Sequence, residues 1–143
     1  MPTTFNNAKC GITNAERRDA IKNTISSFSD LSKINQNGSP QKKALNWLLQ
    51  KDGFSVCPDQ TLHVVQRYIL AVVYFATDGD NWTKCNRGDN NCFGVDATGT
   101  RTDYESYLSS SDVCTWFGVG CSSGGEITEV VLGKNKTASN DSK

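Results

Sequence analysis

The sequence predicts an α+β protein, mainly α, in which a core of three helices precedes a long disulfide-closed loop and a short terminal β-hairpin. Apolar residues recur at three- and four-residue steps in three segments between residues 14 and 76. Residues 84–112 are rich in Gly, Asn, Asp, Ser and Thr, and the short runs 116–121 and 127–132 flank a Ser-Ser-Gly-Gly turn. The 143 residues suggest one domain over 13–132, between an irregular segment at 1–12 and a polar tail at 133–143.

Start and stop signals mark the three predicted helices. The first helix spans 14–29 and begins with a capping box, in which Thr13 and Glu16 bind each other's main chain. The second helix is expected to begin at Ser39-Pro40 and to end at Asp52-Gly53. The third is expected to begin after Asp59, as its cap, and to end at Asp78-Gly79-Asp80. The loop at 84–112 is expected to carry one helical turn near 104–108.

The apolar faces of these helices predict the core. Residues 69–75 form the most apolar stretch of the chain. The expected centre and its backing residues are Ile69, Val72 and Val73, with Leu45, Leu48 and Phe28. The densest basic spots, Arg17-Arg18 and Lys42-Lys43, are interpreted as solvated helix faces.

Six cysteines indicate a disulfide framework and therefore an oxidising compartment, at Cys10, Cys57, Cys85, Cys92, Cys114 and Cys121. A zinc site is the alternative. Zinc ligands favour a gap of about two to four residues between paired cysteines. Six residues lie between Cys85 and Cys92, and six between Cys114 and Cys121. The single histidine, His63, lies inside a helical pattern, so we expect no metal.

Four N-x-S/T sequons also favour a secreted or cell-surface protein that carries N-linked glycans. Their asparagines are Asn37, Asn81, Asn135 and Asn140. Residues 1–30 contain no apolar run typical of a signal peptide, and no segment is apolar enough to predict a membrane span. We therefore expect an extracellular location without a signal peptide or an anchor visible in this chain.

Charge and motifs argue against several classes of function. Fifteen basic and fifteen acidic residues balance, so no net charge favours nucleic acid. The chain has no glycine-rich phosphate loop, G-x-S-x-G, H-E-x-x-H or C-x-x-C motif. Six cysteines can pair completely, which leaves no thiol nucleophile, and Glu126 and Glu129 are interpreted as solvent-facing strand residues. We expect neither an enzyme nor a cofactor.

The segment Cys114-Thr115-Trp116-Phe117-Gly118-Val119-Gly120-Cys121, with Ile127 to Leu132 and Asn135 after it, resembles the N-terminal cap of plant-type leucine-rich-repeat proteins. That family reads C-x-W-x-G-V-x-C, then a short turn and the first repeat strand. The upstream part is similar to the version in diatom leucine-rich-repeat proteins. The matching pieces, which run from about residue 10 to residue 135 with the motif above, are Gly11-Ile12-Thr13, Glu16-Arg17, Gly38-Ser39-Pro40-Gln41, Ala44-Leu45, Trp47-Leu48, Cys57-Pro58, Gln66-Arg67-Tyr68, Tyr74-Phe75-Ala76-Thr77, Gly79 and Trp82.

The sequence also suggests which cysteines form disulfides with one another. We predict a Cys114–Cys121 disulfide, which closes a tight loop and stabilises by roughly 2–3 kcal/mol in the loop-entropy model. We propose Cys85–Cys92 and, if the first two helices are antiparallel, Cys10–Cys57; a Cys57–Cys85 bond stays open as an alternative. Trp116 and Phe117 are interpreted as packing residues that cover the end of a repeat array.

The sequence departs from the family after Leu132, where N-x-L-x-G and further repeats of 20–29 residues are expected. Threonine and serine stand where the leucine and glycine should be, and no repeat follows. Ile127, Val130, Val131 and Leu132 are therefore expected to form an uncovered interaction edge. It would contact a leucine-rich-repeat partner or a second copy, in a non-enzymatic recognition module for protein or glycan. The alternative is a structural subunit of an extracellular glycoprotein assembly.

Overall fold

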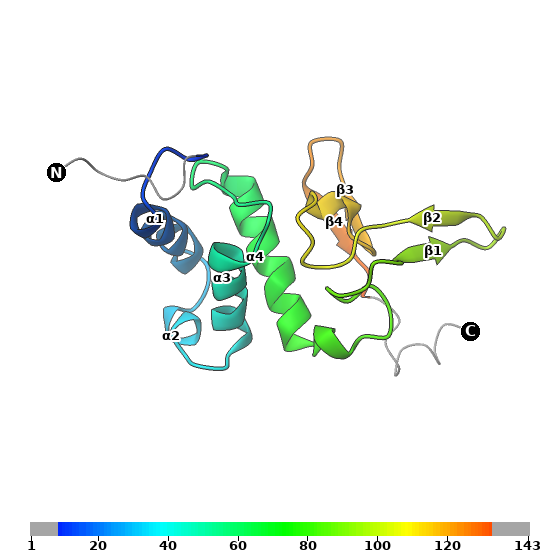
Figure 1. Ribbon diagram of the computed structural model, residues 1–143, viewed down its shortest axis with the longest axis horizontal. Helices are drawn as coiled ribbons and strands as arrows, with labels where there is room; N and C mark the ends of the chain where they lie inside the picture. Colours follow the sequence, from blue (N-terminus) through cyan, green and yellow to red (C-terminus); the bar gives the residue numbers. More distant parts are fainter. Residues whose placement is uncertain (1–8, 133–143) are drawn as a thin grey trace. The chain divides into compact units, whose positions relative to one another are not determined.

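The computed structural model describes residues 9–132 and has a mixed α+β fold with three disulfides (Figure 1). Four α-helices, two short 3-10 helices and two small antiparallel sheets make up this described part. The chain divides into two compact units. Unit 1 comprises Met1–Lys51 and Ser55–Val72; unit 2 comprises Asp52–Phe54 and Val73–Lys143.

Helix α1 (Asn14–Ser26) opens unit 1 with the predicted capping box. The Glu16 main-chain N–H donates to the Thr13 hydroxyl (3.1 Å), and the Thr13 N–H donates to the Glu16 carboxylate (3.0 Å). Ile21 and Ile25 are fully buried on one face of this helix. The helix ends three residues before the predicted end at residue 29.

The prediction of a three-helix core was wrong, because a fourth helix, α2 (Leu31–Ile34), lies between α1 and α3 (Pro40–Gln50). Asp30 caps α2 by accepting from the Ser32 N–H (2.9 Å), and Ile34 buries its side chain. Four residues make about one helical turn, which is too short to show apolar periodicity. Ser39 caps α3 with its hydroxyl, as predicted.

The predicted core centre was also wrong. Helix α4 (Thr61–Ala76) buries Val64, Tyr68 and Ala71, whereas Ile69 is 43% exposed. Val72 and Val73 are only half-buried, and Phe28 is 47% exposed. Leu45 and Leu48 are buried, as expected. The apolar residues of α4 surround the helix, so their spacing alone does not identify the face that packs.

Arg17 is not on a solvated face, contrary to the sequence-based interpretation. Its side chain is buried, and its guanidinium donates to the carbonyls of Val56 (2.8 Å), Leu49 (3.1 Å) and Leu48 (3.5 Å). The last carbonyls of a helix have no partner within the helix. Arg17 of α1 therefore caps the C-terminal end of α3.

Unit 2 contains a hairpin inside the predicted loop, and no helical turn is present at 104–108. Strand β1 (Phe93–Val95) pairs antiparallel with β2 (Arg101–Asp103). The Asp96 carboxylate fixes the turn by accepting from the Thr98 hydroxyl (2.6 Å) and from the N–H of Thr98 and Thr100 (both 2.9 Å).

The predicted terminal hairpin is present with shorter strands. Strand β3 (Val119–Cys121) pairs antiparallel with β4 (Ile127–Val130), and the register shifts between Gly120 and Cys121. The 3-10 helices η1 (Gly79–Asn81) and η2 (Val113–Thr115) precede the two hairpins. The β3–β4 hairpin carries the expected interaction edge.

Candidate interaction site

The β4 end, by which we mean residues 127–132, exposes a short apolar run. Val130 is 40% exposed, Val131 49% and Leu132 40%, while Ile127 is half-buried. Contiguous apolar side chains that are exposed to solvent often form part of an interaction site. The structure thus places three of the four predicted edge residues in solvent.

The outer edge of β4 has no second strand within residues 9–132, because β3 and β4 form a two-stranded sheet. The Val131 N–H donates to the Gly118 carbonyl (2.7 Å), and Glu129 lies opposite Gly120. Hydrogen bonding alternates along an antiparallel strand. The main-chain groups of Val130 therefore point away from β3, in position to pair with another strand.

Gly118 allows β4 to lie this close to β3. Its φ is +80°, and a Cβ atom there would collide with the Val131 carbonyl oxygen. The Cys114–Cys121 disulfide closes the segment on both sides of Gly118, with Cα atoms 5.8 Å apart. Gly118 and the two cysteines thus have local structural roles in this chain.

Trp116 anchors the same segment in unit 2. Its side chain is fully buried, and its ring centroid lies 5.2 Å from that of Tyr107. Tyr107 in turn contacts Trp82 (4.9 Å) and stacks near Tyr74 (6.1 Å). Phe117 is half-buried, with its ring edge-to-face with another tyrosine, Tyr104, at 5.4 Å. The hairpin therefore rests on an aromatic cluster.

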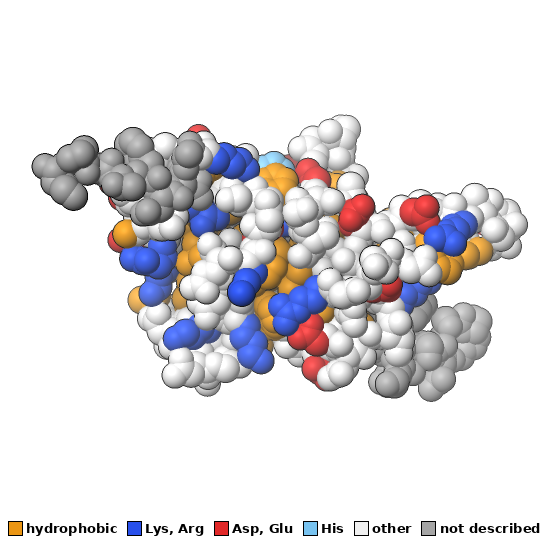
Figure 2. Space-filling view, viewed as in Figure 1, with side chains coloured by type: hydrophobic (Ala, Val, Ile, Leu, Met, Phe, Trp, Pro, Cys, Tyr) orange, Lys and Arg blue, Asp and Glu red, His pale blue; other side chains and the backbone are white. Residues whose placement is uncertain are grey.

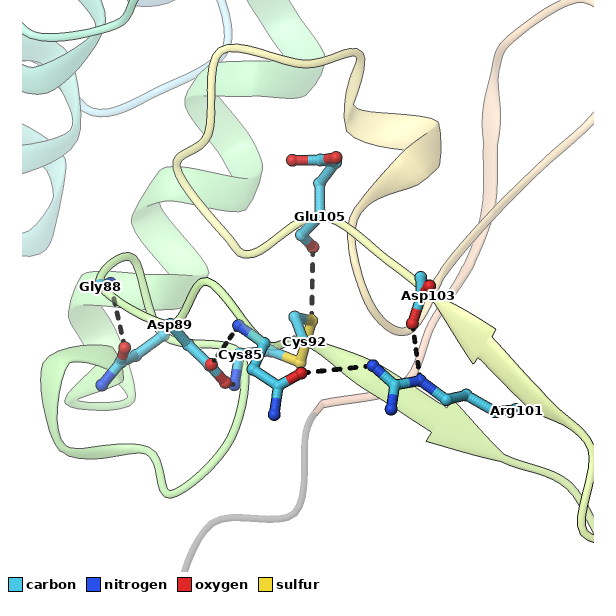
Figure 3. Close-up of a disulfide and its surroundings, with 9 residues drawn as sticks. Cys85, Gly88, Asp89, Cys92, Arg101, Asp103 and Glu105 are labelled. Atoms are coloured by element: carbon cyan, nitrogen blue, oxygen red, sulfur yellow. Dashed lines mark hydrogen bonds and ion pairs between the residues drawn. A yellow bond between two sulfur atoms is a disulfide. The ribbon is translucent and has the colours of Figure 1, made fainter.

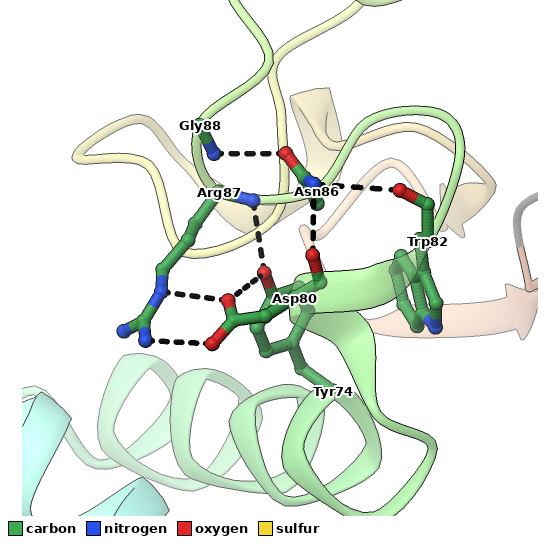
Figure 4. Close-up of polar contacts among 6 residues, drawn as sticks. All are labelled: Tyr74, Asp80, Trp82, Asn86, Arg87 and Gly88. Carbon is green, nitrogen blue, oxygen red and sulfur yellow. Dashed lines mark hydrogen bonds and ion pairs between the residues drawn. The ribbon is translucent and has the colours of Figure 1, made fainter.

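A polar network fixes the turn after α4, which supports this aromatic cluster (Figure 4). The Tyr74 hydroxyl donates to Asp80 Oδ1 (2.7 Å) and accepts from the Arg87 N–H (3.0 Å). The Arg87 guanidinium binds both carboxylate oxygens of Asp80 at 2.9 Å. Burial raises the pKa of Tyr74, so the hydroxyl stays protonated and keeps its role as donor. No sequence signal pairs these residues.

The Cys85–Cys92 disulfide closes the loop that follows (Figure 3). Cys85 adopts φ +63°, which is rare for a residue with a side chain. Its N–H donates to Asp89 Oδ2 (2.6 Å), and its carbonyl accepts from the Tyr107 N–H (3.1 Å). The disulfide thus connects the loop to the aromatic cluster.

The cysteine pairs are those proposed from the sequence, and the Cys57–Cys85 alternative does not occur. The third bond, Cys10–Cys57, joins the start of unit 1 to the segment before α4, with Cα atoms 5.5 Å apart. All six cysteines are bonded.

The expected glycosylation sites divide into two groups. Asn37 and Asn81 are exposed. The Asn81 side-chain N–H donates to Asp78 (2.8 Å), whereas the Asn37 carbonyl oxygen accepts from Lys42 (2.8 Å). Asn135 and Asn140 lie outside the described residues. Glycans at the first two sites stay a prediction.

Each unit has a hollow in its surface. One, of about 500 Å³, lies beside the Cys10–Cys57 disulfide in unit 1; the other, of about 260 Å³, lies beside Arg87 and Glu105 in unit 2. Neither lining contains a histidine or a free thiol. Within residues 9–132, no three His, Cys, Asp or Glu side chains gather as metal ligands, and no helix there is long and apolar enough to cross a membrane.

The comparisons with known proteins give no relative for this chain. It matches no protein-family model, no curated protein and no solved structure. The β4 end is therefore interpreted from its own geometry and from the motif that precedes it.

Proposed function

We propose that this protein is a non-enzymatic extracellular recognition module of the leucine-rich-repeat cap type, and that it binds a protein partner through the β4 end. The observation that carries the proposal is the free outer edge of β4, with Val130, Val131 and Leu132 in solvent. In a repeat array the first strand is covered by the next repeat, and a cap covers the opposite side. Trp116 and the Cys114–Cys121 loop directly precede the strand, and this order supports the proposal.

The disulfides support the extracellular location, because three such bonds in a small domain are typical of oxidising compartments. The exposed sequons at Asn37 and Asn81 favour the same location. A disulfide-closed domain with an open strand edge is suited to binding another protein by strand addition.

Grafting tests the cap function. A plant-type leucine-rich-repeat array that lacks its own cap should aggregate, because its first repeat exposes an apolar face. With the repeats joined directly after Leu132, the fusion should stay soluble and unfold together with the array in one transition. The same fusion with Val130→Lys is the matched control, and it should lose both properties. An array that unfolds independently of the graft, or aggregates equally with and without it, contradicts the proposal.

A further inference from the structure

The balanced net charge of the chain hides a strong segregation between its two units. The described residues of unit 1 contain nine Lys or Arg and four Asp or Glu, a formal charge of +5. Those of unit 2 contain three basic and ten acidic residues, a formal charge of −7. Figure 2 shows several basic side chains over helices α1 to α3, while others lie in the region of the β1–β2 hairpin. One chain thus carries two surfaces of opposite charge.

The β4 end belongs to the acidic unit. Glu126 and Glu129 are both exposed and lie beside the apolar run that ends at Leu132. Glu129 sits in β4 itself, directly before Val130. A partner for this surface needs apolar side chains for the strand and cations for its rim.

Unit 1 carries a surface with these properties. The α1–α2 corner, which we define as Phe28, Leu31 and Lys33, exposes Phe28 to 47% and Leu31 to 50%, and Lys33 is exposed. The Phe28 ring packs edge-to-face on Tyr68 at 6.0 Å, which fixes its position. Asp30 also lies in this corner, where it is exposed and accepts from the Ser32 N–H and hydroxyl at the start of α2. The corner is therefore an apolar pair beside one cation, Lys33, and one carboxylate, within a unit of formal charge +5.

We infer that the β4 end binds the α1–α2 corner of a second copy of this chain. The inference rests on the proposed role of the β4 end as a contact surface and adds its partner. This contact uses the side chains of the β4 end, because the corner is helical and offers no strand to the free edge. Apolar residues would meet apolar residues, and Glu126 and Glu129 would face Lys33. Because the two surfaces differ, the contact is head-to-tail, and each copy can bind one neighbour at each surface. Such contacts build rings or open chains, as a structural subunit of an extracellular assembly would.

Sedimentation velocity of the full-length protein over a concentration series tests this inference. At about 0.01 M salt the Debye length is about 30 Å, and at about 1 M it is about 3 Å. Oligomers should grow with concentration at low salt and weaken by about tenfold or more at high salt. Lys33→Glu and Glu129→Lys should each weaken association by about tenfold. The double variant should restore it, because the charges then match again with their signs exchanged.

Lys51→Glu is the matched control. It makes the same charge change on an exposed residue of unit 1, directly after the end of α3 that lies farthest from α2. At about 0.15 M salt, where the Debye length is about 8 Å, it should leave association within about twofold of the parent. A loss equal to that of Lys33→Glu, or a double variant that is no better than the singles, overturns the inference.

Two further outcomes also overturn it. One is a monomer at every salt and concentration. The other is a monomer whose basic unit binds a sulfated polysaccharide, which would assign the positive charge to an acidic glycan. The cap proposal is tested separately. If the graft fails but the chain still self-associates, only the cap function is refuted. If the graft succeeds but the chain is a monomer, only the binding of a second copy is refuted.

Discussion

The buried Arg17 gives the sharpest test of how unit 1 is held together. In Arg17→Met the apolar stem stays and the guanidinium is lost, so the carbonyls of Leu49 and Val56 lose donors at 3.1 and 2.8 Å. A hydrogen bond to a charged group contributes about 1.5–3 kcal/mol. Two such bonds, less the gain from no longer burying a charge, predict a loss of about 3 kcal/mol. That is a large share of the roughly 5–15 kcal/mol that holds a domain folded.

Urea denaturation followed by circular dichroism measures this loss, and hydrogen exchange locates it at the C-terminal end of α3. Arg18→Met is the matched control, since Arg18 is exposed and its contact with Asp19 is a surface pair at 3.7 Å. The control should change stability by less than about 0.5 kcal/mol. If Arg17→Met costs less than about 1 kcal/mol, or no more than its control, Arg17 does not cap α3.

Three other predictions follow from burial and hydrogen bonding. In the same urea assay, Ile69→Ala should lower the free energy of unfolding by less than about 1 kcal/mol and Leu48→Ala by about 2–5 kcal/mol, because only Leu48 is fully buried. Equal losses would show that Ile69 belongs to the core. Tyr107→Phe should keep or raise the free energy of unfolding, because the Tyr107 hydroxyl is buried and has no hydrogen-bond partner among the described residues. The same burial raises the pKa of Tyr107 to about 12. A loss of stability above about 1 kcal/mol would show that the hydroxyl does have a partner. Hydrogen bonds from Thr98 and its neighbours hold the pKa of Asp96 below the ordinary value of about 3.9, so the turn is stabilised above that value and loosens as pH falls through the folded pKa. A carboxyl NMR titration of Asp96 at or above 3.9 would contradict this.

Local chemistry made part of the fold predictable. The capping box at Thr13 and the Ser39-Pro40 start depend on residues within one helical turn, so the sequence carries the whole signal. The Cys114–Cys121 bond and the terminal hairpin were predicted correctly for a similar reason, because the cysteine spacing and the Ser-Ser-Gly-Gly turn each describe one short segment.

Other features depend on partners far away in the sequence. Arg17 binds carbonyls 31 to 39 residues away, and main-chain acceptors leave no mark on residue type. The strand β2 is exposed at all three positions, so it lacks the alternation that predicts a strand. The charge segregation became visible only once the boundaries of the two units were known.

Amide hydrogen exchange at Val130 tests the central claim most directly, because its N–H points away from β3. In the full chain at about 1 M salt, where charge attraction is screened, this amide should exchange rapidly. In the fusion with a leucine-rich-repeat array it should become strongly protected, while the Val131 amide, already bonded to Gly118, changes little. Equal exchange at Val130 in both proteins would show that the edge of β4 is not the contact surface.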